Sequence, residues 1–199
     1  GGVETGYKTF RALSWLNTDN DRCGFAGQIE DHLTFEDYVD YVLEAPMIFI
    51  NRNSETIPVN GKISFSQFMQ DGFGGYEADI DDFKLHANLY FPEVRMRNFI
   101  EIRNHDCVGK DLQYSILAIY KSILYSHTAI EEIEDLLKPF DYPDYSELRY
   151  NVPKTAMETR IGHYAVKDIA KEILYIAEKS LIGQNEYEEK YLEPIKEYT

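Results

Sequence analysis

The chain has 199 residues, of which 44% are hydrophobic, and this is enough for one domain, or for one compact part of a larger one, with a buried core. Its formal net charge of -15, from 35 acidic and 20 basic residues, would repel the phosphate backbone of a nucleic acid, so nucleic acid is not an expected partner. No hydrophobic segment approaches the roughly 18 to 20 residues of a membrane span, and no signal-like segment is present, so we expect no membrane contact and a cytoplasmic protein.

The N-terminus and the two cysteines lead to two further expectations. The sequence starts at Gly1 without a methionine and enters dense, motif-like sequence within a few residues, so we expect a chain that lacks the N-terminal portion of its protein. Cys23 and Cys107 are too isolated for a disulfide framework or a metal motif, and both are expected to be reduced thiols.

The first third of the chain predicts short, mixed elements. Residues 7–15 suggest a strand or loop edge, and the polar residues 17–22 suggest turns. Thr34 is expected to begin a helix through a capping box with Asp37, and this helix should end before Pro46. One helix face would then carry Phe35, Tyr38, Val39 and Val42.

The next segments alternate between strand and helix patterns. Residues 47–50 and 56–59 predict a hairpin, Ser64 begins a short helix over 65–69, and residues 79–86 predict a helix with an acidic first turn. Residues 94–103 alternate as one strand would, with one face that carries Arg95, Arg97, Phe99, Glu101 and Arg103. That face is too polar for a core, so it is either open to solvent or the wall of a charged site.

After Gly109 the hydrophobic residues follow a helical period to the C-terminus. Pro139, Pro143 and Pro153 are expected to separate the helices, and Gly183 to cap the last long one. The sequence therefore predicts an α+β protein with a helical C-terminal layer.

Glu101 and Arg103 are the strongest candidates for chemistry, because residues two apart on a strand project to the same side. A carboxylate that binds Mg²⁺ beside a guanidinium that clamps a phosphate is what phosphoryl transfer requires. Spacing alone favours the alternative, a cross-strand ladder of salt bridges.

A second candidate group surrounds the polar turn. Arg11 and Arg22 could bind a carboxylate substrate, with Trp15 as an apolar wall. The alternative is a core tryptophan with arginines paired to Asp19 or Asp21. The histidines have no metal-binding spacing, His86 is expected to be a half-buried structural residue, and no P-loop, dinucleotide fingerprint or nucleophile elbow is present.

The order of these motifs resembles the glutamate–cysteine ligases of plants and many bacteria. Residues 10–24, with Phe10-Arg11-Ala12 and Thr18-Asp19-Asn20-Asp21-Arg22, are similar to that family's FRS and TDTDNDRTG segments. Further matches in the same order are residues 38–47 to YVDYALDVPM, 64–69 to SFRDFM, 86–95 to HLTTIFPEVR and 98–106 to YLEMRGAD. The resemblance extends from Tyr7 to Ile195.

The resemblance implies an antiparallel sheet like that of glutamine synthetase, in which Mg²⁺, ATP and glutamate meet, with helices behind it. Residues 1–110 would form part of this sheet region and residues 111–199 the helical layer of the same structural domain. Glu101 would ligate Mg²⁺, and Arg103 would bind ATP and act in catalysis. Arg22 would act in catalysis and in substrate binding, and the other substrate-binding residues would be Arg11, Trp15 and Tyr41.

The implied reaction is ATP-dependent ligation of the glutamate γ-carboxylate to the cysteine amine through an acyl phosphate. The partners would be glutamate, cysteine, ATP and the missing N-terminal half of the enzyme, without which the chain should be inactive. Two departures are Ala12 in place of Ser and Asn104-His105 in place of Gly-Ala. Two alternatives stay open, namely a related ligase with another amine acceptor, and a binding or structural module without catalysis.

Overall fold

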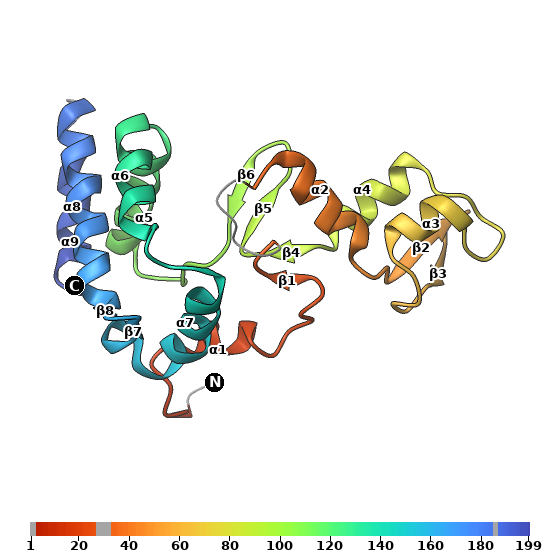
Figure 1. Cartoon of the computed structure of the whole chain (residues 1–199), viewed down its shortest axis with the longest axis horizontal. Coiled ribbons are helices and arrows are strands. Elements are labelled where there is room, and N and C mark those ends of the chain that lie inside the picture. Colours follow the sequence, from red (N-terminus) through yellow and green to blue (C-terminus); the bar gives the residue numbers. More distant parts are fainter. Residues whose placement is uncertain (1–2, 27–32, 185–186) are drawn as a thin grey trace. The chain divides into compact units, whose positions relative to one another are not determined.

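The computed structural model describes residues 3–26, 33–184 and 187–199, and it divides the chain into two compact units. One unit comprises residues 15–105, and the other comprises residues 1–14 together with residues 106–199 (Figure 1). Within the described ranges, no helix has the length and hydrophobicity that crossing a bilayer requires.

The unit of residues 15–105 consists of short helices and two-stranded sheets, and this mixture is compatible with the predicted α+β class. The sheets pair β1 with β4 in parallel, and β2 with β3 and β5 with β6 antiparallel. Its elements are β1 (Cys23–Gly24), α2 (Phe35–Glu44), β2 (Phe49–Arg52), β3 (Glu55–Pro58), α3 (Phe65–Asp71), α4 (Ile80–Asn88), β4 (Phe91–Pro92), β5 (Val94–Met96) and β6 (Ile100–Ile102), and α1 (Phe10–Trp15) ends at its first residue.

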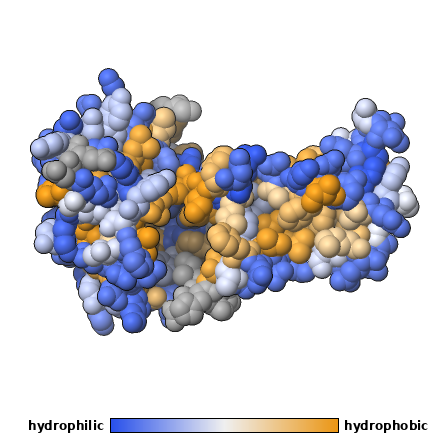
Figure 2. Space-filling model, turned by 90° about the horizontal axis from the view of Figure 1, so that it is seen from above, coloured by the Kyte–Doolittle hydropathy of each residue, from blue (hydrophilic) through white to orange (hydrophobic). Residues whose placement is uncertain are grey.

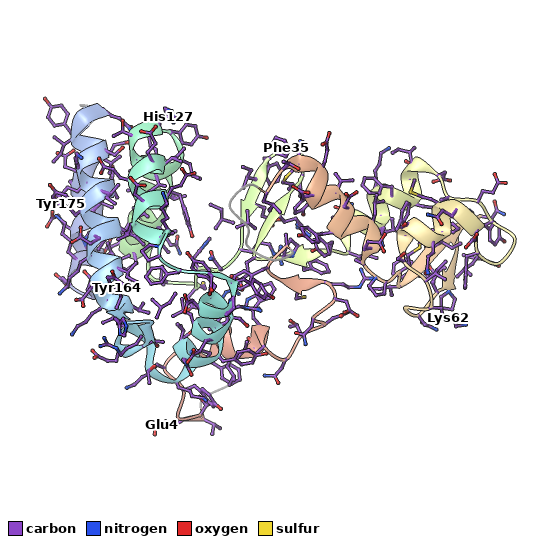
Figure 3. All side chains as sticks on the ribbon, viewed as in Figure 1. Glu4, Phe35, Lys62, His127, Tyr164 and Tyr175 are labelled. Carbon is purple, nitrogen blue, oxygen red and sulfur yellow. The ribbon has the colours of Figure 1, made fainter. Side chains whose placement is uncertain are left out.

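The second unit is mainly helical, as the sequence predicts. Its elements are α5 (Lys110–Leu124), α6 (His127–Leu137), α7 (Tyr142–Thr155), η1 (Ala156–Glu158), β7 (Arg160–Ile161), β8 (Tyr164–Ala165), α8 (Val166–Gln184), η2 (Glu189–Leu192) and α9 (Glu193–Lys196). Helices α5, α6 and α8 pack on one another around Ala118, Ala177, Leu181 and Leu192. Outward-facing side chains such as Tyr175 on α8 point away from this core (Figure 3).

Local sequence signals set several element boundaries as expected. Thr34 and Asp37 form the predicted capping box of α2, which ends at Glu44, before Pro46. Ser64 caps α3 in the same way. The hairpin of β2 and β3 turns through Asn53 and Ser54, both at positive φ, as its tight two-residue turn requires.

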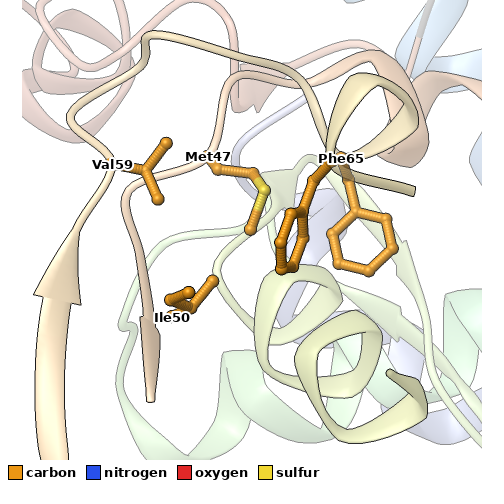
Figure 4. Packing of buried hydrophobic residues seen from close by; sticks show 5 residues of the cluster. Met47, Ile50, Val59 and Phe65 are labelled. Atoms are coloured by element: carbon orange, nitrogen blue, oxygen red, sulfur yellow. The ribbon is translucent and has the colours of Figure 1, made fainter. Parts of the chain in front are cut away.

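The core of residues 15–105 gathers around that hairpin. Met47, Ile50, Val59, Phe65 and Phe68 form one buried cluster, most of which Figure 4 labels. A second cluster contains Tyr38, Val42, Ala45 and Tyr90. Hydrophobic residues also remain on the surface of this unit, on the right in Figure 2, beside charged ones.

Several local predictions are wrong, and four of them concern helices. Residues 10–15 are helical rather than extended, since they include good helix formers and Thr9 Oγ1 accepts a hydrogen bond from Ala12 N. Helix α2 buries Tyr38 and Val42 but leaves Phe35 72% exposed and pointing outward (Figure 3), because its packing stripe is narrower than the predicted face.

The other two errors concern helix ends. Pro153 lies inside α7, where its carbonyl accepts hydrogen bonds from Lys8 N and Thr9 N, and α8 continues through Gly183 to Gln184.

Candidate functional site

The strand predicted over residues 94–103 is in fact a tight hairpin, and this brings the charged residues together. Arg97 N donates a hydrogen bond to Phe99 O across the turn, so that Arg95 on β5 lies directly opposite Glu101 on β6. Both side chains therefore project from the same face of the hairpin, as alternation predicts. The opposite face carries the pairs Val94 with Ile102 and Met96 with Ile100.

Two arginines hold the two oxygens of Glu101. Arg95 Nε and Nη2 each lie 2.6 Å from Glu101 Oε2, and Arg103 Nη1 lies 3.2 Å from Oε1. These contacts, led by the Arg95 hydrogen bond, lower the pKa of Glu101, so the carboxyl is ionised at neutral pH. Two guanidinium groups and one carboxylate leave a local positive charge in an acidic chain.

Two aromatic rings face the arginines of this cluster. The guanidinium carbon of Arg103 lies 5.8 Å from the ring centroid of Trp15 and 5.5 Å from that of Phe91, and the Arg95 guanidinium lies 5.5 Å from the same Phe91 ring. Such contacts are cation–π interactions, which orient the arginine heads and limit water around them. Trp15, which the sequence analysis placed in a second candidate group, thus lies beside the predicted pair of Glu101 and Arg103.

Arg22 lies in the same unit and is nearly fully buried. Its Nη1 donates to Leu89 O at 3.2 Å, and its Nε lies 3.4 Å from a carboxylate oxygen of Asp19. Burial lowers the pKa of Arg22 from its usual value, and Asp19 and Asp21 oppose that shift. The alternative that an arginine pairs with Asp19 is therefore found here. Arg22 O also accepts a hydrogen bond from Phe91 N, which connects it through β4 to the arginine cluster.

The remaining predicted residues lie elsewhere. Tyr41 packs against the cluster of Tyr38 and Tyr90, where burial raises the pKa of Tyr90 to about 12. Arg11 belongs to the other unit and lies 3.9 Å from Asp106.

His86 is a structural residue, as predicted, although it is buried more completely. Its Nε2 lies 2.7 Å from Val42 O and its ring stacks on Phe65. The thiols of Cys23 and Cys107 are both free, as expected.

The sequence interpretation missed the roles of Arg95 and Phe91. The available signal was the strand alternation together with the Phe91-Pro92-Glu93-Val94-Arg95 motif, but neither reveals a hairpin register. Among the described residues, no group of three or more His, Cys, Asp or Glu side chains could hold a metal ion.

A family model of glutamate–cysteine ligases, the glutamate–cysteine ligase family 2, matches residues 1–198. This chain belongs to that family. A chloroplastic glutamate–cysteine ligase A of Oryza sativa subsp. indica is 32% identical over 184 residues, which cover 90% of this chain. The chloroplastic enzymes of Nicotiana tabacum and Arabidopsis thaliana are each 28% identical over 200 residues, or 98% of the chain.

These comparisons cover only part of each relative, and they correct the predicted cellular compartment. This chain spans only 37% to 38% of the length of these three relatives. All three relatives are named as chloroplastic, and this finding contradicts the prediction of a cytoplasmic protein. The prediction rested on composition and hydropathy, which do not encode the compartment in which a protein works.

Proposed function

We propose that this chain forms part of the active site of a glutamate–cysteine ligase, which joins the glutamate γ-carboxylate to the cysteine amine in an ATP-dependent reaction. Membership of the ligase family supports the proposal. The observation that carries it is the cluster of Arg95, Glu101 and Arg103, bordered by Trp15 and Phe91. The chain as a whole has a net charge of -15, but this cluster has two guanidinium groups and only one carboxylate. Its local positive charge would attract the phosphate groups of ATP.

The chemistry proceeds in two steps. Transfer of the ATP γ-phosphoryl group to the glutamate γ-carboxylate gives ADP and an acyl phosphate. The neutral cysteine amine then attacks the acyl carbon and expels phosphate, and the amide forms with loss of a proton from nitrogen. Arg103 binds the phosphate oxygens and stabilises their charge during transfer. Arg22, Trp15 and Tyr41, which all belong to the unit of residues 15–105, contribute to the glutamate and cysteine pockets.

Glu101 fits the role of one Mg²⁺ ligand. Its side chain is 31% exposed and its Oε1 has a single arginine contact at 3.2 Å, so this oxygen can exchange partners. Proteins commonly bind Mg²⁺ through one or two carboxylates together with substrate phosphates. When bound, the ion neutralises phosphate oxygens. The other protein ligands would come from the part of the ligase that this chain does not match.

The same reasoning extends to the fold and the partner. We propose that β5 and β6 belong to a larger antiparallel sheet of the glutamine synthetase type, since an isolated two-stranded hairpin is marginally stable. The remaining strands would be supplied by the portion of the relatives' length outside the match, and without it the chain would not turn over substrate.

The test is an assay of γ-glutamylcysteine and ADP formation by a polypeptide that joins this chain to that remaining portion. We expect ATP-dependent product with cysteine, and none from the 199-residue chain alone. The same assay with other amines separates a related ligase, which would prefer another acceptor. A complete polypeptide that forms an amide with no amine tested, and does not hydrolyse ATP, would refute the proposal.

A further inference from the structure

We propose that Arg95 is a positioning residue that fixes Glu101, so that Arg103 can leave this carboxylate for an anionic phosphate while Glu101 keeps its place. The ligand assignment depends on the proposed function, whereas the division of labour between the two arginines depends on the geometry of the hairpin alone.

Arg95 is buried, and each nitrogen of its guanidinium contacts an oxygen. It is only 7% exposed, and two of its nitrogens reach Glu101 Oε2 at 2.6 Å. Its third guanidinium nitrogen, Nη1, donates to Asn88 O at 3.3 Å and to Tyr90 O at 3.5 Å, at the end of α4. A guanidinium that is held by backbone carbonyls and faces a ring cannot rotate without loss of several contacts, so it sets the direction of the Glu101 side chain.

Arg103 has a different relation to the same carboxylate. Its side chain is 23% exposed, and one nitrogen reaches Glu101 Oε1 at 3.2 Å, a longer distance than either Arg95 contact. The flat faces of Trp15 and Phe91 allow the guanidinium to slide while it stays over aromatic carbon. One oxygen of Glu101 is thus fixed and the other is exchangeable.

A second ion pair in the same unit shows what a purely structural pair looks like. Arg52 binds both oxygens of Asp82, at 2.6 and 2.5 Å, and the Asp82 side chain is 3% exposed. Asp79 N also donates to Asp82 Oδ2. Both carboxylate oxygens are therefore closed to any ligand, unlike Oε1 of Glu101. Arg52 also faces a ring, that of Tyr76 at 5.4 Å, so it is a matched control.

The test uses Trp15, the single tryptophan, as a reporter of the Arg103 position in the 199-residue chain. Arg95→Lys keeps the charge but cannot contact Glu101 and both carbonyls at once. We expect both Arg95→Lys and Glu101→Gln to shift the Trp15 emission spectrum, because each change alters the contact between Glu101 and the Arg103 guanidinium that lies over this ring. Arg52→Lys should lower the melting temperature and leave the emission unchanged.

A second measurement covers the case in which Arg95→Lys fails to fold. In the wild-type chain, NMR should show slow rotation of the Arg95 guanidinium about its Nε–Cζ bond and faster rotation for Arg103.

In the complete ligase, Arg95→Lys should raise the Mg²⁺ requirement by about 10- to 100-fold, the usual effect of losing a partner that orients a ligand. A ligase without activity would refute the proposed function but leave the fluorescence result valid. Unchanged Trp15 emission in a folded Arg95→Lys chain, or faster rotation of Arg95 than of Arg103, would overturn the assignment.

Discussion

Replacement of Arg103 by lysine tests whether this arginine binds phosphate or only belongs to a ladder of salt bridges. Lysine keeps one positive charge near Glu101 but loses the planar head that lies over Trp15 and Phe91. Each cation–π contact at a partly exposed site contributes about 0.5–1 kcal/mol, so the two together are worth about 1–2 kcal/mol. For a chain of this size, that loss lowers the melting temperature by about 2–8 °C.

The expected effect on turnover is much larger than the effect on stability. Removal of one preorganised donor to a developing anion typically reduces kcat by about 10²- to 10³-fold. A lysine ammonium supplies charge without the paired donors that match a phosphate, so we expect Arg103→Lys in the complete ligase to lose activity in that range. The ladder alternative predicts the same small loss of stability and near-normal kcat, because partly exposed ion pairs contribute little.

The assay is steady-state ligase kinetics paired with a thermal melt of each variant. Arg52→Lys is the control, since it makes the same substitution at an arginine that also pairs with a carboxylate and faces a ring. It should lower the melting temperature and leave kcat unchanged. If Arg103→Lys also retained normal kcat, Arg103 would be removed from the active site and the ladder interpretation would stand.

Three further predictions concern stability. Burial lowers the pKa of His86, so below about pH 6.5 the unfolded chain binds a proton that the folded chain does not, and stability falls from pH 7.5 to pH 5.5. Urea midpoints measured at both pH values should show this fall and show less of it in His86→Gln, and equal wild-type midpoints would contradict it. Phe68→Ala empties a fully buried position and should cost about 3–5 kcal/mol in urea unfolding followed by tryptophan emission, whereas a cost near zero would show that the cluster does not stabilise this unit. Thr34→Ala removes the N-cap of α2 and should cost about 0.5–2 kcal/mol in the same experiment, and an unchanged midpoint would argue against the cap.

Local signals in the sequence predicted those parts of the fold that neighbouring residues control. The capping box of Thr34 and Asp37, the helix stop before Pro46 and the β2–β3 hairpin depend on contacts over a few residues, and all are present. Predictions failed where distant packing outweighed local preference. Pro153 was expected to end a helix, yet α7 continues past it while the Pro153 carbonyl accepts hydrogen bonds from residues near the N-terminus.

The sequence by itself determined the family, since the order of its motifs is independent of how they fold, and it determined that Arg95 and Glu101 share a face. Only the tertiary structure decided that these two side chains touch. On one continuous strand, residues six apart would be about 20 Å from each other. The turn at Arg97 to Phe99 folds that strand back on itself in a register that pairs position 95 with position 101. The turn removes the separation along the chain, and the even register keeps both side chains on the same face of the hairpin. Arg95 Nε therefore lies 2.6 Å from Glu101 Oε2.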